Sequence, residues 1–376
     1  MKIIYLANLR LPTEKAYGIQ IAKMCEAFND AGHEVTLIYP ERQNKIKDNI
    51  FDYYGLRDSF DCNRVGVLDF YWPGFLDKFA AVIKNYISAK KLVHEALKYK
   101  DADIFYTRDE LVAYFLSCYK KNVIFESHRF SNKRKIFYSR FKKLNLKIVA
   151  ISQELKDAFI RFGYKESNIL VARDGVDAAL FDINLSKEES RRTCNLPQDK
   201  KIIMYSGHLF EWKGADVLAE AAYNMPDSLF VFAGGTDRDI EKFKAKYKSD
   251  NILILGRSPH SKVPSLLKAA DVLVLPNRSK EIISEKYTSP LKLFEYMMSQ
   301  RPIVASDLPS IREVLNDKNS ILVGSDSPAE LMRGIEKVLS DSSLAERIAI
   351  QSYQDVKEYT WSRRAEKIIR FYAQDN

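Results

Sequence analysis

The stretch Tyr287-Thr288-Ser289-Pro290-Leu291-Lys292-Leu293-Phe294-Glu295-Tyr296-Met297 follows a polar, charged loop. Serine is favoured at a helix N-cap and proline at the first helical position, so the sequence predicts a helix that begins at Pro290. The exposed N–H groups and positive dipole end of such a helix favour a phosphate, and Lys292 adds a full charge in the first turn. Glu295 follows one turn later, where it can accept hydrogen bonds from sugar hydroxyls. The stretch therefore predicts a site for a diphosphate flanked by a ribose.

Short apolar runs, separated by helical patterns, lie on both sides of this stretch. Near-continuous apolar strands of this kind are typical of parallel sheets buried on both faces. Two such series predict an α/β protein with two Rossmann-like, doubly wound domains, and a ligand at the strand C-termini that face the cleft between them. The predicted strands are 2–7, 35–39, 104–107, 123–126 and 148–151 in the first half, and 202–206, 229–233, 252–255, 272–275, 303–305 and 321–323 in the second.

The length of 376 residues is too great for one ordinary core, which also indicates two domains. Residues 182–200 are polar and charged and are the predicted boundary. We therefore expect an N-terminal domain over residues 1–182 and a C-terminal domain over residues 200–358.

The composition, with 46% hydrophobic and 29% charged residues, is that of a soluble globular protein. No uncharged apolar run has the length of a transmembrane helix, and the apolar start is too soon interrupted by Arg10 to be a signal peptide. The four cysteines are scattered without metal-ligand spacing, which favours a reducing cytoplasm without structural disulfides. Cys25 and Cys118 lie in apolar segments, where buried thiols are common.

Much of the net charge of +9 comes from residues 129–147, which contain eight basic residues and no acidic one. Phe130, Phe137, Phe141 and Leu144 recur there at roughly helical spacing. This pattern fits a solvated basic face whose aromatic side chains point into the core. It also fits docking on an anionic membrane surface and, with the least support, binding to nucleic acid. The basic residues are Arg129, Lys133, Arg134, Lys135, Arg140, Lys142, Lys143 and Lys147.

An aromatic cluster surrounds Pro73-Gly74. Because aromatic residues near helical spacing usually pack inward, we expect this cluster to fill the core. A lid and a second membrane-facing patch are the alternatives. The cluster consists of Phe70, Tyr71, Trp72, Phe75 and Phe79.

The loop after strand 202–206 contains two glycines and a lysine. Gly207 follows a strand directly, where the absence of a side chain lets a ligand approach the backbone. Lys213 precedes a helix and is either a surface charge or a phosphate clamp. The flanking Gly207 and Gly214, together with the phosphate-ready helix downstream, favour the clamp. His208 is positioned to donate to the same phosphate.

Further loops follow the next two strands. Gly234-Gly235 marks a second close approach to the backbone, and Gly256 leads into Arg257-Ser258-Pro259-His260, where the backbone can contact a nucleobase. In the first half, Gly18 lies between the first strand and the first helix and can bring the backbone near a phosphate; a simple turn is the alternative.

Glu126-Ser127-His128 ends a buried strand. His128 can donate to an anion or a hydroxyl, although its local sequence favours a histidine satisfied by the fold. The triplets at 101–103 and 237–239 are read as turn and cap residues rather than ligands of a divalent ion. The sequence thus predicts no metal site.

Together these pieces resemble the retaining nucleotide-sugar glycosyltransferases of family 4, which have the GT-B fold. The resemblance covers nearly the whole chain. Its most specific parts are the loop from Gly207 to Gly214, the helix opening at Ser289, and the segments Arg301–Asp307, Asp174–Asp177 and Tyr359–Trp361.

The resemblance implies an acceptor-binding first domain, a nucleotide-sugar-binding second domain, and a last helix, about 360–376, that crosses back to the first. It implies that Lys213 holds the donor diphosphate, that Glu295 binds the ribose, and that His128 lies near the reacting sugar. His208 stands where the family often has an arginine, and Gly18 matches a glycine beside the donor phosphates. The remaining donor-binding candidates are Gly207, Gly234, Arg257, Pro259, His260, Tyr287, Ser289, Pro290, Leu291 and Lys292.

The chain departs from the family pattern at Tyr287, where the family has a glutamate that contacts the transferred sugar. Glu281 and Glu285 are possible substitutes for it. The function expected is metal-independent transfer of a sugar from a UDP- or GDP-linked donor, with no cofactor, to a glycan or lipid-linked acceptor in cell-envelope polysaccharide synthesis. We expect a cytoplasmic location at the inner face of the membrane, contact through residues 129–147, and no nucleic acid. The alternatives are a catalytically altered binding protein, a sugar-nucleotide epimerase, and a phosphorylase-like enzyme.

Overall fold

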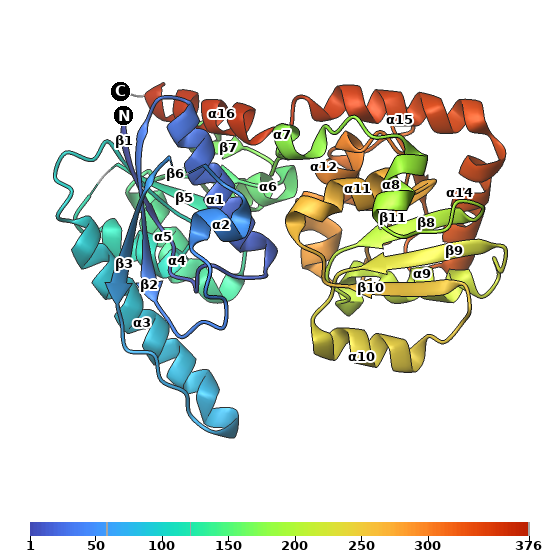
Figure 1. Cartoon of the computed structure of the whole chain (residues 1–376). Coiled ribbons are helices and arrows are strands. Elements are labelled where there is room, and N and C mark those ends of the chain that lie inside the picture. Colours follow the sequence, from blue (N-terminus) through green and yellow to red (C-terminus); the bar gives the residue numbers. More distant parts are fainter. Residues whose placement is uncertain (58, 121, 375–376) are drawn as a thin grey trace. The chain divides into compact units, whose positions relative to one another are not determined.

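A computed structural model describes residues 1–57, 59–120 and 122–374 and divides the chain into two compact units. The first unit comprises Met1–Arg173 and Trp361–Asn376, and the second comprises Asp174–Thr360. Both are α/β units built on a parallel sheet, as the sequence predicted (Figure 1).

The sheet of the first unit has the strand order β3-β2-β1-β4-β5-β6-β7 within the described residues. Its strands are β1 (Lys2–Leu6), β2 (Glu34–Glu41), β3 (Asp61–Gly66), β4 (Ile104–Thr107), β5 (Val123–Ser127), β6 (Lys147–Ala150) and β7 (Ile169–Val171). Its α-helices are α1 (Ala16–Asp30), α2 (Ile50–Tyr54), α3 (Asp77–Ala96), α4 (Glu110–Leu116), α5 (Lys135–Lys143), α6 (Gln153–Arg161) and α16 (Trp361–Ala373). Short 3₁₀ turns are η1 (Gly74–Leu76), η2 (Asn132–Arg134) and η3 (Glu166–Asn168).

The sheet of the second unit has the order β10-β9-β8-β11-β12-β13. Its strands are β8 (Lys201–Ser206), β9 (Ser228–Ala233), β10 (Ile252–Gly256), β11 (Val272–Leu275), β12 (Ile303–Ser306) and β13 (Ile321–Val323). Its α-helices are α7 (Ala178–Phe181), α8 (Lys187–Thr193), α9 (Ala215–Ala222), α10 (Asp237–Lys246), α11 (Val263–Lys268), α12 (Leu291–Met298), α13 (Pro309–Arg312), α14 (Pro328–Ser340) and α15 (Ser342–Val356). The 3₁₀ turns η4 (Glu211–Lys213) and η5 (His260–Lys262) and the π-helical turn η6 (Ile283–Tyr287) complete it.

The strands of the second sheet bury both faces. Along β8, Ile202 and Met204 belong to one apolar cluster, whereas Ile203 and Tyr205 belong to the other. Successive side chains of a strand point to opposite faces, so helices must cover both sides of the sheet. This arrangement leaves the carboxyl edge of the strands, where the loops after β8, β9 and β10 emerge, as the place for a ligand.

The units divide earlier in the chain than the predicted stretch 182–200. The chain enters the second unit at Asp174, and the predicted linker contains α8, which begins with a capping box between Ser186 and Glu189. The Arg191 side chain of α8 is buried and binds Asp271 at 2.6 Å. A polar segment can therefore be part of a folded unit when its charges are paired internally.

Residues 129–147 form η2, α5 and the start of β6. Five of their eight basic side chains bind partners within the first unit. Arg129 and Arg134 pair with Glu110, Arg140 donates to the Ser117 hydroxyl, and Lys142 and Lys147 donate to backbone carbonyls. On the apolar side, Tyr138 and Phe141 are buried. The solvated basic face with inward aromatic residues therefore describes much of this segment, and Lys133, Lys135 and Lys143 stay exposed.

The expectation that the aromatic cluster fills the core is wrong. Tyr71, Trp72, Phe75 and Phe79 are all exposed, because the first half of α3 packs with small and polar residues, Ala80 and Lys84, instead. The thiol expectation holds for Cys25, which is buried, but not for Cys118, which is exposed. The acidic triplets are explained by folding: Asp239 completes the capping box of α10, and Asp101 and Asp103 bind Lys2.

Candidate functional site

Two lysines of the second unit meet beside one glycine at the carboxyl edge of the sheet. A Cβ placed on Gly207, which follows β8 with a φ of +126°, would lie 3.7 Å from Lys292 Cδ and 4.0 Å from Lys213 Nζ. The lysines come from η4 and from the first turn of α12, so two separate loops bring them together. A side chain at Gly207 would therefore contact both lysine side chains.

The Lys292 ammonium is buried without a hydrogen-bond partner among the described residues. Its side chain is 7% exposed, and Nζ lies 4.0 Å from the centroid of the Tyr205 ring. Burial, followed by the nearby charge of Lys213, holds the pKa of Lys292 well below its usual range. Burial likewise lowers the pKa of Lys213 to about 8, and Glu295 opposes that shift. Two neighbouring lysines, one buried and one half-buried, are unfavourable as cations unless an anion joins them, so the geometry fits a ligand such as a phosphate.

Helix α12 is present as predicted, but it begins at Leu291. Pro290 has a ψ of 122° and stands before the helix, and the Ser289 hydroxyl accepts from the Asp174 amide at 3.0 Å instead of capping the helix. The predicted start is therefore one residue early. Lys292 is the second residue of α12, so it still lies in the first turn, where the helix has its free N–H groups and the positive end of its dipole.

Glycines shape the loops around the lysine pair for reasons of space. A Cβ on Gly214 would lie 1.7 Å from the Pro276 carbonyl oxygen, and one on Gly234 would lie 2.5 Å from the Gly207 carbonyl oxygen. Gly234 therefore allows the loops after β8 and β9 to pack closely, and its amide already donates to the Gly256 carbonyl. Only glycine satisfies both the positive φ and the close approach at these positions.

Glu295 is held by a histidine. Nε2 of His260 lies 3.0 Å from Oε1 of Glu295, and the His260 ring packs 5.3 Å from the Phe181 ring. This pairing fixes one carboxylate oxygen at the C-terminal side of the first turn of α12. Arg257 and Pro259 lie exposed in the loop between β10 and η5.

Two further candidates, His208 and Tyr287, lie in the loop after β8 and at the end of η6. The His208 ring stacks on Phe210 at 4.9 Å, and its backbone carbonyl accepts from the Tyr205 hydroxyl. Tyr287 is half-buried at the end of η6, where the resemblance placed a glutamate. Of the two acidic substitutes, Glu281 is exposed and Glu285 is half-buried.

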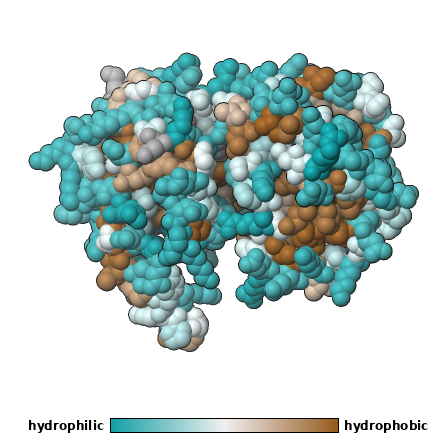
Figure 2. Space-filling view, viewed as in Figure 1, coloured by the Kyte–Doolittle hydropathy of each residue, from teal (hydrophilic) through white to brown (hydrophobic). Residues whose placement is uncertain are grey.

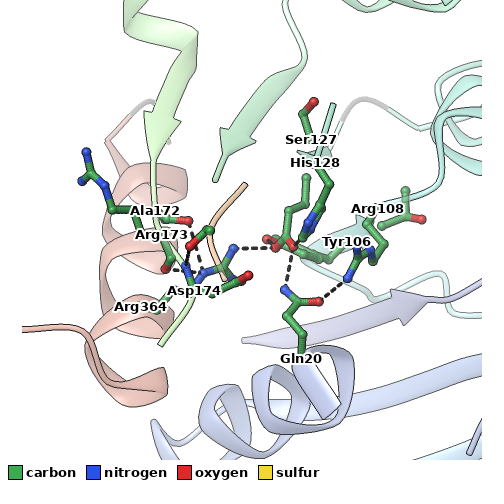
Figure 3. A network of polar contacts seen from close by, with 12 residues as sticks. Gln20, Tyr106, Arg108, Ser127, His128, Ala172, Arg173, Asp174 and Arg364 are labelled. Carbon is green, nitrogen blue, oxygen red and sulfur yellow. Dashed lines mark hydrogen bonds and ion pairs between the residues drawn. The ribbon is translucent and has the colours of Figure 1, made fainter. Parts of the chain in front are cut away.

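The first unit contains a buried polar network centred on Glu126 (Figure 3). Its carboxylate, at the end of β5, lies 2.5 Å from His128 Nε2 and accepts from Gln20 at 2.6 Å and from Arg364 at 2.9 Å. The Tyr106 hydroxyl also donates to it. Arg108 extends the network by donating to the side-chain amide oxygen of Gln20 at 2.7 Å.

This network fixes the chemical state of His128. The Arg364 and His128 partners hold the pKa of Glu126 well below its usual range despite complete burial, so the carboxylate is ionised and only accepts. Burial and Arg108 lower the pKa of His128 to about 4, so its ring is neutral near pH 7. Nε2 must then carry the proton that faces Glu126, which leaves Nδ1 as a hydrogen-bond acceptor. The contact with Glu126 satisfies His128 within the fold, as its local sequence favoured.

Gly18 does not lie in a loop. It is the third residue of α1, and a Cβ there would lie 2.0 Å from the Tyr54 hydroxyl oxygen and 2.6 Å from Thr13 Cγ2. Close packing within the first unit is sufficient to require glycine at this position.

Sequence reasoning missed Gln20, Tyr106, Arg108 and Arg364. Glu126 carried a usable signal, since an acidic residue that ends an apolar strand must find partners in the fold. Nothing local pointed to Arg364, which lies 238 residues further along the chain.

No group of three or more His, Cys, Asp or Glu side chains in the described ranges has the arrangement of a metal site. Among the described helices, none combines the length and apolar character needed to span a bilayer.

Comparison with known proteins places both halves of the chain in one class. Residues 18–180 match the family model described as Glycosyltransferase Family 4, and residues 186–355 match the model described as Glycosyl transferases group 1. A glycosyltransferase of Methanocaldococcus jannaschii, MJ1607, is 29% identical over 243 residues, which are 60% of this chain and 59% of that protein. The chain thus matches about three fifths of the length of that relative.

Solved structures show the same fold over the whole chain. Sucrose-phosphate synthase from Thermosynechococcus elongatus superimposes with a TM-score of 0.78 at 19% identity, over 99% of this chain and 98% of that one. HepE from Anabaena, solved in complex with UDP and glucose, superimposes with a TM-score of 0.74 at 15% identity, over 100% of both chains. The chain belongs to glycosyltransferase family 4 and has the GT-B fold of two Rossmann-like units.

Proposed function

We propose that the chain transfers a sugar from a nucleoside diphosphate donor to a hydroxyl acceptor, with retention of anomeric configuration. The observation that carries the proposal is the pair of lysines beside Gly207, of which Lys292 is buried and Lys213 is half-buried. Two ammonium groups at the start of a helix suit a diphosphate, which brings the negative charge that the pair lacks. The donor is a UDP- or GDP-sugar, and UDP has the additional support that a structural neighbour was solved with UDP and glucose.

The same groups favour departure of the nucleoside diphosphate. As the bond from the anomeric carbon to the leaving oxygen breaks, negative charge grows on the β-phosphate. Lys213, Lys292 and the first N–H groups of α12 are already oriented, so they stabilise that charge without reorganising. In this proposal the two lysines perform the role that a metal ion has in other transferases, and the leaving phosphate takes up the acceptor proton.

Glu295 is the proposed ribose ligand. One of its carboxylate oxygens is occupied by His260, so the other is left to accept from ribose hydroxyls. His260 and the loop from Arg257 to Pro259 then contact the base side of the nucleotide. The donor is also contacted by the backbone of Gly207, Gly234, Ser289, Pro290 and Leu291 and by the side chains of His208 and Tyr287.

The first unit is proposed to hold the acceptor, with His128 near the reacting sugar. Nδ1 of a neutral His128 accepts a hydrogen bond from a sugar or acceptor hydroxyl, while Glu126 keeps the ring oriented. The acceptor is a glycan or a lipid-linked sugar of cell-envelope polysaccharide synthesis, reached from the cytoplasmic side. The exposed lysines of residues 129–147 support contact with an anionic membrane.

The proposal is tested by calorimetry and transfer assays on two variants. Lys213→Ala should weaken UDP binding, and both Lys213→Ala and Glu295→Ala should remove most transfer activity while the fold survives. Lys268→Ala, which alters a buried lysine of the second unit outside the pair, is the control and should bind UDP like the native chain.

A thermal-shift screen against UDP-, GDP-, ADP- and TDP-sugars identifies the donor, because a ligand of the native state raises the melting temperature. Full activity in both variants would refute the assignment. Release of free nucleoside diphosphate without any acceptor would favour an epimerase. Absence of all nucleotide binding would favour a binding protein that has lost the reaction.

A further inference from the structure

The segment from Leu68 to Tyr86 turns large apolar side chains outward. Phe75 is 74% exposed, Val82 69% and Tyr71 60%. Soluble proteins rarely expose a contiguous apolar patch of this kind without a partner. The exposed members are Leu68, Tyr71, Trp72, Phe75, Leu76, Phe79, Val82, Ile83 and Tyr86.

Packing within the first unit explains why these side chains point outward. The side of α3 that packs inward consists at this end of Ala80, Lys84 and Ser88, all buried. Small and polar residues therefore face the protein while large apolar residues face solvent, which reverses the usual pattern of a surface helix. Figure 1 shows the N-terminal end of α3 projecting beyond the sheet of its own unit, and Figure 2 shows white and brown side chains gathered there.

The base of this segment is fixed by specific contacts. The buried Lys84 pairs with Asp69 at 3.1 Å, donates to the Phe70 carbonyl and lies 3.7 Å from the centroid of the Tyr71 ring. Gly74, with a φ of +60°, turns the chain into η1. These contacts hold the loop in place, so the exposed rings belong to an ordered surface.

Ring contacts connect this surface to α4 and α5. Tyr86 packs 5.4 Å from Phe115, and Tyr114 packs 5.9 Å from Phe115 and 5.5 Å from Phe137. Ile136, which precedes Phe137 on α5, is 69% exposed. Ring contacts thus connect the segment from Leu68 to Tyr86 with α4 and α5 of the first unit.

The charges around this surface are mainly positive. Lys78, Lys90, Lys133, Lys135 and Lys143 are exposed. The acidic residues of the same elements are engaged: Asp69 pairs with Lys84, Asp77 accepts from the Trp72 amide, and Glu110 pairs with Arg129 and Arg134. Apolar and aromatic side chains within a ring of lysines complement an anionic lipid surface, where rings enter the interface and lysines contact the head groups.

We propose that residues 68–86 insert into an anionic membrane and form the main apolar part of a docking surface, to which residues 129–147 contribute positive charge and the exposed Ile136. The docking is a property of the first unit and does not depend on the donor or on the reaction proposed above. A second copy of the chain is the alternative occupant of an exposed apolar patch.

Trp72 provides a direct reporter for the test. It is exposed, whereas Trp361 is buried and Trp212 lies half-buried in the second unit. Vesicles of phosphatidylglycerol and phosphatidylcholine should shift the tryptophan emission to the blue, and brominated lipid should quench it. Trp72→Phe should abolish most of this response. No response of the native chain, or an equal response in Trp72→Phe, would overturn the proposal.

Sedimentation with the same vesicles tests the apolar and charged contributions separately. Phe75→Asp should weaken binding about tenfold or more, and Lys78→Glu combined with Lys90→Glu should weaken it by about fivefold or more for each charge lost. The matched controls lie in the second unit: Ile350→Asp, an exposed apolar position, and Lys242→Glu with Lys244→Glu on α10 should bind like the native chain.

UDP calorimetry on the same variants keeps this proposal distinct from the proposed function, because Phe75→Asp should leave UDP affinity unchanged. Failure of native UDP binding with intact vesicle binding would affect only the enzyme assignment. Equal vesicle binding by Phe75→Asp, or a dimer that Phe75→Asp disrupts in the absence of any vesicle binding, would overturn the assignment to a membrane.

Discussion

Replacing Lys292 by methionine should make the protein more stable and weaken its binding of nucleotide. The Lys292 ammonium is buried, has no hydrogen-bond partner among the described residues, and lies near Lys213. Methionine retains most of the side-chain volume and is favourable near the Tyr205 ring. The substitution thus removes a buried amine that has no hydrogen-bond partner among the described residues, without opening a large cavity.

The magnitude follows from the typical cost of an unsatisfied buried polar group, about 1–3 kcal/mol. For a unit of this size, each kcal/mol corresponds to a rise of about 2–4 °C in melting temperature. A hydrogen bond from a charged group to phosphate contributes about 1.5–3 kcal/mol, so the Kd for UDP should rise by roughly 10- to 150-fold.

Scanning calorimetry without ligand and titration calorimetry with UDP measure the two effects on one preparation. Lys268→Met is the control, because Lys268 is also buried in the second unit but lies outside the lysine pair. It should leave UDP affinity unchanged. A Lys292→Met protein that is less stable than the native chain and binds UDP equally well would refute the reasoning, because it would show a structural role for this lysine.

Four other perturbations test other parts of the structure. The pKa of Lys213 is lowered to about 8, and only its charged form favours phosphate. UDP affinity should therefore fall as pH rises through about 8, and UDP binding near that pH should be accompanied by proton uptake. Equal binding enthalpies in buffers of different ionisation enthalpy would contradict this proton uptake. The pKa of His128 is lowered to about 4 from an ordinary value of 6.5, so its neutral form stabilises the fold fully above pH 6.5. This contribution should be lost as pH falls from 6.5 towards 4. The free energy of unfolding, measured by urea titration, should therefore depend differently on pH in the native chain and in His128→Asn over that range. Glu126→Gln leaves the buried Arg364 without its counter-charge and should lower the free energy of unfolding by about 3–5 kcal/mol, and an unchanged denaturation midpoint would be evidence against a structural ion pair. Gly214→Ala places a Cβ against the Pro276 carbonyl and should displace Lys213, so UDP binding should weaken far more than in Gly55→Ala, where nothing lies within 4 Å of the added Cβ.

The sequence was sufficient for most of the fold. Strands such as Ile104–Thr107 and Val272–Leu275 agree with the prediction, because a buried parallel strand is marked by a continuous apolar run. The edge strand β3 was missed because Asp61–Gly66 is largely exposed and lacks such a run. The brief strand Ile169–Val171 was also missed, since three apolar residues do not form a pattern.

The site was partly predictable from the sequence. Glycines and lysines in loops after strands pointed to the region where Gly207, Lys213 and Lys292 meet. Neither the burial of Lys292 nor the His260–Glu295 contact was visible, because both depend on how separate loops pack. For the same reason the Glu126 network, closed by Arg364 from the last helix, could not be predicted.

The outward aromatic cluster shows a different limit of sequence reasoning. Helical spacing alone does not show whether a stripe of apolar residues faces the core or the solvent. This stripe consists of Phe75, Phe79, Val82 and Tyr86. The choice of face was decided by Ala80 and Ser88, which fit closely against the sheet side of the unit. Periodicity identified the helix, but only tertiary packing determined which stripe is buried.

A crystal structure of the chain with bound UDP tests most directly whether the two lysines form the diphosphate site. We predict that Lys213 Nζ and Lys292 Nζ lie within hydrogen-bond distance of the phosphate oxygens, with Gly207 facing them. A nucleotide bound elsewhere in the second unit, with both ammonium groups in their present positions and without contact to the phosphates, would contradict the account.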